Sequence, residues 1–343
     1  MKAAVKQEPR PGITLTTVPE PTCGPNQIIL RIAAAAICGT DLHIYKWDET
    51  GRHHARRLPV ILGHEFMGEI VEIGGSVTGF RIGQRVAADP AFTCGVCMAC
   101  RTGQFNLCDH REVIGIDHNG AFSQYAVVNP ALLYDLPDEV SDEEGAFLET
   151  FGVGVHAVEK AGLKPGDTAV VIGAGPIGLS TLVCAQAAGA RKTYLIERHS
   201  PVRLNAAKEL GAEAAIDADE TDPVKAILDL TGGQRVDVVF EASGSPVALQ
   251  QAVSLTRKGG QIVAIGTPPQ NNAEIPLLPL ILQEISLIGI RGRNHMTWLR
   301  AINLIKKVNV APIIGPVVSL DDIDEAFRKA INREVIKIII RPN

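Results

Sequence analysis

Four cysteines lie within fifteen residues of this 343-residue chain, at a spacing that suits a metal ion. They are Cys94, Cys97, Cys100 and Cys108. Thiolates at such short intervals match the tetrahedral coordination of zinc. Because four sulfurs fill every position of a tetrahedron, the spacing predicts a closed structural zinc site.

Disulfides and an iron–sulfur cluster are the alternatives to zinc for these four cysteines. Disulfides need an oxidising compartment, and the first residues, MKAAVKQEPRPG, contain no apolar segment typical of a secretory signal. Iron–sulfur ligands usually have three residues, or a separate region of the chain, before the last cysteine. The sequence therefore favours reduced thiols in a cytoplasmic protein. Of the other cysteines, Cys23 and Cys184 stand apart, and Cys184 is expected in the core.

A second group of possible ligands lies earlier in the chain. Cys38 is followed by Thr40 and His43, and then by His64 and Glu65. Zinc accepts thiolate, imidazole and carboxylate ligands. Three such ligands leave a fourth position for water or an alcohol. Taken alone, a single buried cysteine is usually part of the core, and a single histidine is more often a hydrogen-bonded structural residue.

A glycine-rich loop follows one apolar run and precedes another. Its residues Gly173, Gly175, Pro176 and Gly178 fit the dinucleotide fingerprint, in which glycines permit a tight turn and a close approach of backbone to pyrophosphate. Glu197 lies nineteen residues beyond Gly178, where a carboxylate accepts hydrogen bonds from ribose hydroxyls. The pattern favours NAD. The adjacent Arg198 keeps NADP open, because arginine can hold a 2′-phosphate.

The surrounding elements change character along the chain. Short apolar or alternating runs separated by Gly and Pro predict an antiparallel β domain over the first 150 residues; they are 27–33, 68–73, 85–88 and 121–128. Helical spacing follows over 142–162. Strands at 167–172, 193–197, 214–217, 236–241 and 261–266 then alternate with helices at 177–188, 201–210, 224–230 and 247–255. This alternation predicts a parallel sheet. Helices at 299–307 and 323–332 and a strand at 336–341 end the chain.

The composition excludes several kinds of partner. The net charge of −5 includes no long basic run, and aromatic residues make up only 4%, so neither a phosphate backbone nor stacked bases are expected ligands. Residues 168–190 carry no charge, but the glycines and proline within them fit a strand, turn and helix better than a membrane span.

These motifs together identify a family resemblance. GHEFMGEIVEIG, CGTDLH, the four-cysteine lobe and VVIGAGPIG resemble, in order and interval, the zinc-dependent medium-chain alcohol and polyol dehydrogenases along essentially the whole chain. The resemblance implies an α/β protein with a GroES-like β domain and a Rossmann domain. It implies a catalytic domain with a structural zinc lobe over 1–150, an NAD-binding domain over 151–290, and a return to the catalytic domain over 291–343.

The resemblance also assigns roles to single residues. It implies NAD and two zinc ions per subunit, one catalytic and one structural. Cys38, His64 and Glu65 would hold the catalytic zinc, and Glu149 would approach the same metal. Thr40 and His43 would relay the proton of the alcohol. The cofactor residues would be Gly173, Gly175, Pro176, Ile177, Gly178, Glu197, Arg203, Ile265, Gly266, Thr267, Ile290 and Arg291.

The resemblance leaves the substrate open. HIYKWDE and GIRGRNHMTW look like L-threonine 3-dehydrogenases, whereas the segment 148–179 looks nearer to sorbitol and butanediol dehydrogenases. Threonine dehydrogenases carry a histidine three residues before the first lobe cysteine, and here Ala91 occupies that position. A polyol or vicinal diol is therefore the alternative to threonine. His53 and His54 are expected to be solvated, and Arg56 and Arg57 are candidates for attracting an anionic substrate group. A homotetramer or homodimer is expected, with no nucleic-acid or membrane partner.

Overall fold

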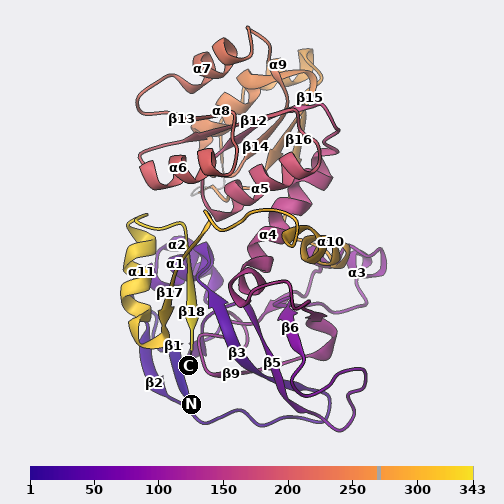
Figure 1. The fold of residues 1–343 in the computed structure, drawn as a ribbon, viewed down its shortest axis with the longest axis vertical. Helices are drawn as coiled ribbons and strands as arrows, with labels where there is room; N and C mark the ends of the chain where they lie inside the picture. The colour runs from indigo at the N-terminus through magenta and orange to yellow at the C-terminus, as the bar shows by residue number, and fades with distance from the viewer. Residues whose placement is uncertain (269–271, 343) are drawn as a thin grey trace. The chain divides into compact units, whose positions relative to one another are not determined.

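The computed structural model describes residues 1–268 and 272–342, which form two compact units. The first comprises Met1–Glu149, Asn294–Lys306 and Ile314–Asn343, and the second comprises Thr150–Arg293 and Lys307–Ile313. Figure 1 shows the chain from its indigo N-terminus to its yellow C-terminus, and the two ends lie side by side on the first unit. In the part of the chain that the structure describes, no helix is long and apolar enough to cross a membrane.

The first unit is built on a seven-stranded sheet. Its order is β10 (Leu133–Asp135), β6 (Arg85–Ala88), β5 (Glu65–Ile73), β3 (Ile28–Ala36), β18 (Lys337–Arg341) and β17 (Ile314–Ser319), with β9 (Tyr125–Val128) also paired to β3. Neighbours are antiparallel except for β17 and β18 of the C-terminal segment, which run parallel. Smaller sheets join β2 (Thr14–Thr17), β1 (Lys2–Lys6) and β4 (Val60–Ile61), and β7 (Ala91–Phe92) with β8 (Glu112–Val113).

The core of this unit combines aliphatic strands with a few aromatic rings. Ile28, Leu30 and Ile32 are fully buried at alternate positions of β3; Ile29 between them is also buried, whereas Arg31 is exposed. The rings of Phe122 and Phe327 meet edge to face with centroids 6.1 Å apart. Residues 121–124 do not extend β9 as expected, because the N–H groups of 121 and 122 bond to the loop after β4 instead.

Helices connect or flank these strands. Two short ones, α1 (Gly39–Lys46) and α2 (Glu49–His54), follow β3 and were not anticipated from the sequence. The others in this unit are α3 (Met98–Arg101), α10 (His295–Ile305) and α11 (Ile323–Ile331). The α10 helix begins four residues before the expected start because Asn294 caps it, its side chain accepting the N–H of Thr297 at 2.9 Å.

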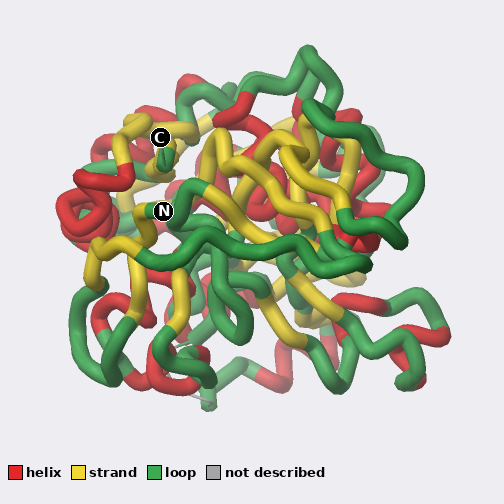
Figure 2. The backbone as a smooth tube through the Cα atoms, turned by 90° about the horizontal axis from the view of Figure 1, so that it is seen from below, coloured by secondary structure: helices red, strands yellow, loops and turns green. Residues whose placement is uncertain are grey.

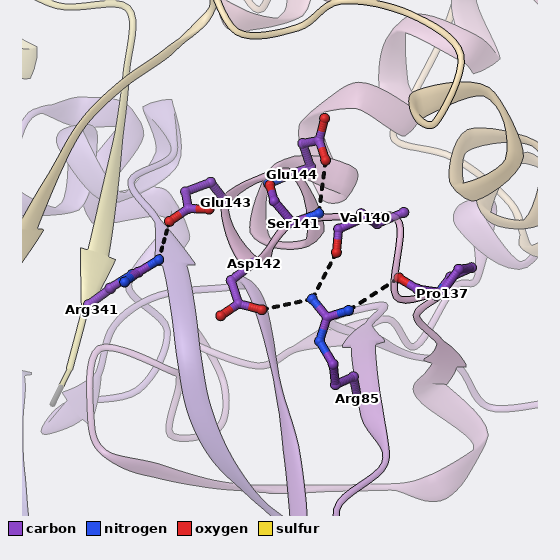
Figure 3. A network of polar contacts seen from close by, with 8 residues as sticks. All are labelled: Arg85, Pro137, Val140, Ser141, Asp142, Glu143, Glu144 and Arg341. Atoms are coloured by element: carbon purple, nitrogen blue, oxygen red, sulfur yellow. Dashed lines mark hydrogen bonds and ion pairs between the residues drawn. The ribbon is translucent and has the colours of Figure 1, made fainter.

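A polar network fixes the start of α4 (Asp142–Ala161), as Figure 3 shows. Ser141 and Glu144 form a reciprocal capping pair, with the Ser141 N–H 2.9 Å from Glu144 Oε2 and the Glu144 N–H 3.1 Å from Ser141 Oγ. Arg85 of β6 donates to Asp142 at 2.8 Å, and Arg341 of β18 pairs with Glu143. The first turn of α4 is therefore tied to two strands of the sheet.

The second unit is a parallel six-stranded sheet with helices between successive strands. Its order is β13 (Ala214–Asp217), β12 (Lys192–Glu197), β11 (Thr168–Ile172), β14 (Val236–Glu241), β15 (Thr256–Ala264) and β16 (Ser286–Gly289). Its helices are α5 (Pro176–Ala187), α6 (Pro201–Glu209), α7 (Pro223–Leu230), α8 (Pro246–Leu255) and α9 (Leu277–Leu282). Figure 2 shows the strands of both units in yellow. The predicted parallel sheet is confirmed, and α9 is an addition to the expected helices.

Parallel strands buried on both faces read as continuous apolar runs, and β11 is the clearest case. All five of its residues are buried, as are most of those of β12 and β14. The uncharged stretch at 168–190 is therefore β11, the glycine loop and α5. Because all strands run the same way, the loops after their carboxyl ends gather at one edge of the sheet.

Candidate metal centres and cofactor site

Three potential metal ligands meet where β3 ends and β5 begins. The ligand atoms of Cys38, His64 and Glu65 all lie within 4.8 Å of one another. The pairing of Ala36 with Glu65 brings the two strand ends together. Gly63 turns the chain into β5 with φ +95°, and a Cβ there would lie 2.7 Å from the ring of Phe122. Only glycine fits both the backbone and the space, so the turn that presents His64 depends on it.

Asp41 contacts two of these three ligand residues, Cys38 and His64. It is fully buried on α1, accepts a hydrogen bond from the Cys38 N–H at 3.0 Å, and places Oδ1 3.4 Å from His64 Nδ1. A carboxylate on the second nitrogen of a ligating histidine fixes the ring and leaves the first nitrogen for the metal. Asp41 was visible in the CGTDLH motif, but its role depends on contacts that the sequence does not show.

Lys337 and Glu149 complete the charged surroundings of Glu65. The Lys337 ammonium on β18 is almost fully buried and lies 2.5 Å from Glu65 Oε2. Burial alone would lower the pKa of Lys337, but the negative charges of Glu65, Cys38 and Glu149 outweigh it and raise that pKa. The lysine therefore stays charged beside the ligand set. No local sequence pattern around Lys337 predicts that it pairs with Glu65.

The chemistry of this group suits zinc. It offers one sulfur, one nitrogen and one oxygen, a combination that zinc binds while keeping a fourth position open. Burial raises the pKa of the Cys38 thiol above its ordinary value, although the neighbouring His64 opposes this. A divalent cation would overcome that penalty, because thiol ligands bind metals as thiolates. The predicted set of Cys38, His64 and Glu65 is thus brought together, with half-buried Glu149 among the charges that act on it.

The expected proton-relay residues lie on α1, three positions apart and so on one side of the helix. His43 Nδ1 is 2.7 Å from Asp48 Oδ2, and its side chain is 40% exposed, so the ring reaches solvent. Burial would raise the pKa of Asp48, but the Gly51 N–H, His43 and Lys46 together lower it to about 2. Asp48 also caps α2. Asp48 was not anticipated as a partner of His43.

The two histidines of α2 differ from each other. His53 is exposed, as expected. His54 is half-buried, although it was expected to be solvated. Burial, together with the positive charges of His53, Arg56, His43 and His64, lowers the pKa of His54. Arg56 pairs with Asp117 at 2.5 Å. His54 is therefore less exposed than its sequence context suggested.

The four cysteines of the lobe supply all the ligands of one tetrahedral metal site. The ligand sulfurs of Cys94, Cys97, Cys100 and Cys108 lie within 4.8 Å of one another. Backbone N–H groups point at these sulfurs, with the N–H of Cys97 3.4 Å from Cys94 Sγ and that of Cys94 3.3 Å from Cys108 Sγ. Such donors stabilise thiolate, and N–H groups of Asp109 and Cys100 lower the pKa of Cys97 to about 6. Four sulfurs with donated N–H groups fit a structural zinc.

The glycine loop forms a cradle at the start of α5. Gly173 has φ +102°, and a Cβ on Gly178 would lie 1.8 Å from the carbonyl oxygen of Gly173. Gly175 is the N-cap of α5, has no side-chain cap and meets nothing within 4 Å of a Cβ position. Pro176 and Ile177 follow in the first turn. Open space beside uncapped N–H groups at a helix N-terminus fits a pyrophosphate.

Glu197 connects this loop to the next strand. Its Oε2 accepts the Ala174 N–H at 2.8 Å, and its Oε1 accepts the Arg198 N–H at 2.7 Å. Arg203 Nη1 lies 3.7 Å from the same carboxylate. A buried carboxylate fixed in this way at the carboxyl end of β12 can still accept ribose hydroxyls through its remaining lone pairs.

The remaining expected cofactor residues lie after β15 and β16. Ile265 and Gly266 donate their N–H groups to the carbonyl of Glu241 at 2.8 and 3.0 Å, and Thr267 follows them. Ile290 donates to the carbonyl of Ala264 at 3.1 Å, and Arg291 comes next. These segments therefore neighbour each other at the carboxyl edge of the sheet. The glycine loop and Glu197 lie at that same edge.

A further residue organises this edge and was missed. The buried side chain of Glu241 accepts the N–H groups of Ser243 at 2.7 Å and Gly244 at 2.9 Å, which fixes the loop after β14. That loop touches the segment after β15, since a Cβ on Gly244 would lie 2.4 Å from the carbonyl oxygen of Thr267. A glutamate that ends an apolar strand was the only available signal.

Comparison with known proteins agrees with this geometry. Residues 24–138 match the alcohol dehydrogenase GroES-like domain, and residues 176–307 match the zinc-binding dehydrogenase domain. A sorbitol dehydrogenase of Bacillus subtilis is 37% identical, covering 100% of this chain and 98% of the relative. The chain belongs to the zinc-dependent medium-chain dehydrogenase family. The predicted fold class, a GroES-like domain with a Rossmann domain, is confirmed.

Other members of the family carry different names. An L-threonine 3-dehydrogenase of Bacillus velezensis is 34% identical over 100% of this chain and 99% of its own. Among solved structures, the 2R,3R-butanediol dehydrogenase of Bacillus subtilis has a TM-score of 0.90 and 34% identity over 100% of this chain and 99% of that chain. A zinc-binding dehydrogenase of Sinorhizobium meliloti with bound NADP has a TM-score of 0.91 and 30% identity, and an Escherichia coli dehydrogenase with NADH has 0.90 and 26%, each over 99% of both chains. As a member of this family, the chain is a zinc-dependent oxidoreductase that acts on alcohol CH–OH groups.

Proposed function

We propose that the protein oxidises a secondary alcohol at the Cys38–His64–Glu65 site and reduces NAD⁺. The observation that carries the proposal is the buried sulfur, nitrogen and oxygen ligand set, with Asp41 holding two of its members. A structural site would instead be closed by a fourth protein ligand, as the cysteine lobe is.

The ligand set prepares the reaction by position and charge. Zinc, when held by these three side chains, acts as a Lewis acid that lowers the pKa of the substrate hydroxyl. Asp41 keeps the His64 imidazole in the orientation that ligation needs. Lys337 holds the Glu65 carboxylate in place by their 2.5 Å ion pair. We assign Glu149 to the same surroundings, as a charge that acts on Glu65 and Lys337.

The proton of the alcohol leaves through α1. Thr40 would accept it at Oγ1 and pass its own hydroxyl proton toward His43. The His43 ring then releases a proton to solvent from its exposed side, while Asp48 holds Nδ1 at 2.7 Å. An imidazole suits this exchange because it both binds and releases protons near neutral pH.

The second unit supplies the cofactor site. NAD⁺, when bound there, would supply the acceptor for the hydride of the alcohol. The pyrophosphate would lie against Gly175 and the N-terminus of α5, and the ribose hydroxyls against Glu197 with Arg203 nearby. The segments Ile265–Thr267 and Ile290–Arg291 are proposed to line the nicotinamide half.

L-Threonine is the first candidate substrate, and a polyol or vicinal diol is the second. The relatives named threonine, sorbitol and butanediol dehydrogenases are of similar identity, so the pocket must decide. Ala91 favours the second candidate. Its methyl side chain offers no polar partner to an amino acid. Its backbone N–H is already bonded to Asp89 Oδ1 at 3.1 Å.

A substrate panel tests the proposal. Reduction of NAD⁺ is followed at equal concentrations of L-threonine, sorbitol, xylitol and 2,3-butanediol with zinc-loaded protein. Turnover with threonine alone supports the first candidate, and turnover with the polyols or the diol supports the second. If no alcohol in the panel or in a wider set of secondary alcohols reduces NAD⁺, the proposal fails.

We further propose a homo-oligomer, either dimer or tetramer, in the cytoplasm. The apolar side chains of α9 support association, because Leu277, Leu278, Ile281 and Leu282 are 62–71% exposed. The neighbouring strand β16 forms an edge of the parallel sheet. All seven cysteines are unpaired thiols, which fits a reducing compartment. Light scattering on the purified protein measures the oligomeric state.

A further inference from the structure

A cluster of charges lies just beyond the carboxyl ends of β12 and β13, beside Glu197. Strands β12 and β13 run parallel, and Glu197 is the register partner of Asp217 at their carboxyl ends. The Ala218 N–H donates to the Glu197 carbonyl at 2.9 Å, so the chain just beyond β13 lies directly beside Glu197. Arg198, His199 and Asp219 project from these two neighbouring loops.

Arg198 is the group that could bind a 2′-phosphate, but its guanidinium is already engaged. Its Nε and Nη2 lie 2.9 and 2.7 Å from Asp219 Oδ1. His199 Nε2 approaches the other oxygen of the same carboxylate at 3.4 Å. The Arg198 side chain is 72% exposed while that of Asp219 is only 17% exposed, so the carboxylate is the fixed partner and the arginine the mobile one.

The fixed position of Asp219 has an independent cause. Its backbone N–H donates to Asp217 Oδ1 at 3.0 Å, which closes a tight turn after β13. The Arg198 guanidinium beside it holds the pKa of Asp219 below its ordinary value, so the carboxylate stays charged. Arg198 thus pairs with Asp219, whereas Arg203 lies beside Glu197.

We propose that Asp219 determines cofactor choice by holding Arg198 away from a 2′-phosphate. This inference rests on the proposed function, because it assumes that a dinucleotide binds at Glu197. Glu197 favours two free ribose hydroxyls, and Asp219 engages the exposed Arg198 guanidinium that could otherwise bind a phosphate there. NADP⁺ would have to break two hydrogen bonds of Arg198 and then meet an uncompensated carboxylate.

Calorimetric titration of the full-length protein with NAD⁺ and with NADP⁺ tests the proposal. Asp219→Asn should tighten NADP⁺ binding by about tenfold, the size of one charge-assisted hydrogen bond at an exposed site. The NAD⁺ dissociation constant should change by less than about twofold, since Asp219 faces Arg198 and not the ribose.

Two further variants show how the effect arises. In the double variant Arg198→Ala with Asp219→Asn, the gain for NADP⁺ should disappear if it comes from the released arginine. Glu213→Gln is a matched control, because it also removes one carboxylate from an exposed ion pair, that with Lys192 at 2.7 Å, but at the amino end of β13. It should leave both dissociation constants unchanged.

The outcomes separate this proposal from the underlying one. If the wild-type protein binds neither dinucleotide, the proposed function fails. If it binds NAD⁺ but Asp219→Asn leaves NADP⁺ affinity unchanged, the role of Asp219 fails alone. A gain that persists without Arg198, or that Glu213→Gln reproduces, would mean that net charge and not the Arg198 pair controls the choice, and would also overturn the proposal.

Discussion

Replacing Asp41 by Asn should weaken zinc binding at the Cys38–His64–Glu65 site by about 10- to 100-fold. The substitution keeps the volume of a fully buried side chain and removes its charge. The Asn amide can still accept the Cys38 N–H, which Asp41 binds at 3.0 Å. It cannot offer a charged acceptor to His64 Nδ1, which Asp41 faces at 3.4 Å.

The size of the effect follows from that distance. At 3.4 Å, two full charges interact by about 5 kcal/mol at an effective dielectric constant of about 20. A metal-ligating imidazole is neutral, so Asp41 acts only on the partial charge of the N–H, about a third of a unit, and about 1.6 kcal/mol is at stake. Since about 1.4 kcal/mol is a factor of ten, the structure predicts a loss of about 15-fold.

Competition with a chelator measures this loss. Zinc-loaded protein is titrated with a chelator of known affinity, and bound zinc is counted after each step. The zinc of the cysteine lobe serves as an internal standard, because Asp41 is not part of the lobe. Asp48→Asn is the matched control, since it removes a carboxylate beside His43 that bonds to no ligand. Equal zinc affinity in Asp41→Asn and wild type would refute the positioning role.

Three other perturbations test separate parts of the account. Lys337→Met should lower the free energy of unfolding of the metal-free protein by about 3–5 kcal/mol, because it leaves the buried Glu65 carboxylate without its partner. The loss should be smaller with zinc bound, and Lys337→Arg should restore the stability. Urea titration measures these differences, and an unchanged stability of metal-free Lys337→Met would contradict a stabilising ion pair. Gly178→Ala should destabilise the second unit, whereas Gly175→Ala should fold normally and bind NAD⁺ more weakly. Scanning and titration calorimetry measure the two effects. Equal stability and equal NAD⁺ affinity in the two variants would contradict the different roles assigned to these glycines. The pKa of Asp48 is lowered to about 2, so its contribution to stability should be full above its ordinary pKa of about 3.9 and lost as the pH falls through about 2. The free energy of unfolding of wild type minus that of Asp48→Asn measures this contribution. A difference that does not vanish in acid would contradict the prediction.

The sequence predicted the elements that local patterns control. Continuous apolar runs separated by amphipathic ones gave the parallel sheet, because buried strands and their crossover helices have distinct periods. The cysteine lobe was readable for a similar reason, since all four ligands lie within fifteen residues. Helix ends shifted by a few residues where a cap decided them, as Asn294 does for α10.

Contacts between distant segments could not be read in the same way. Lys337 reaches Glu65 only because β18 inserts beside β3, and no spacing within the C-terminal segment shows that pairing. The role of Asp219 likewise depends on the register of β12 with β13. The short helices α1 and α2 were missed because charged, aromatic and glycine residues over 39–54 give no clear helical period.

The most direct test of the central claim is a zinc count with an activity measurement on Cys38→Ser. Wild-type protein should hold two zinc ions per chain and reduce NAD⁺ with its best alcohol. Cys38→Ser should hold one, in the cysteine lobe, and lose turnover while still binding NAD⁺. Full turnover by a protein that has lost the zinc at Cys38 would contradict the assignment of the reaction to this site.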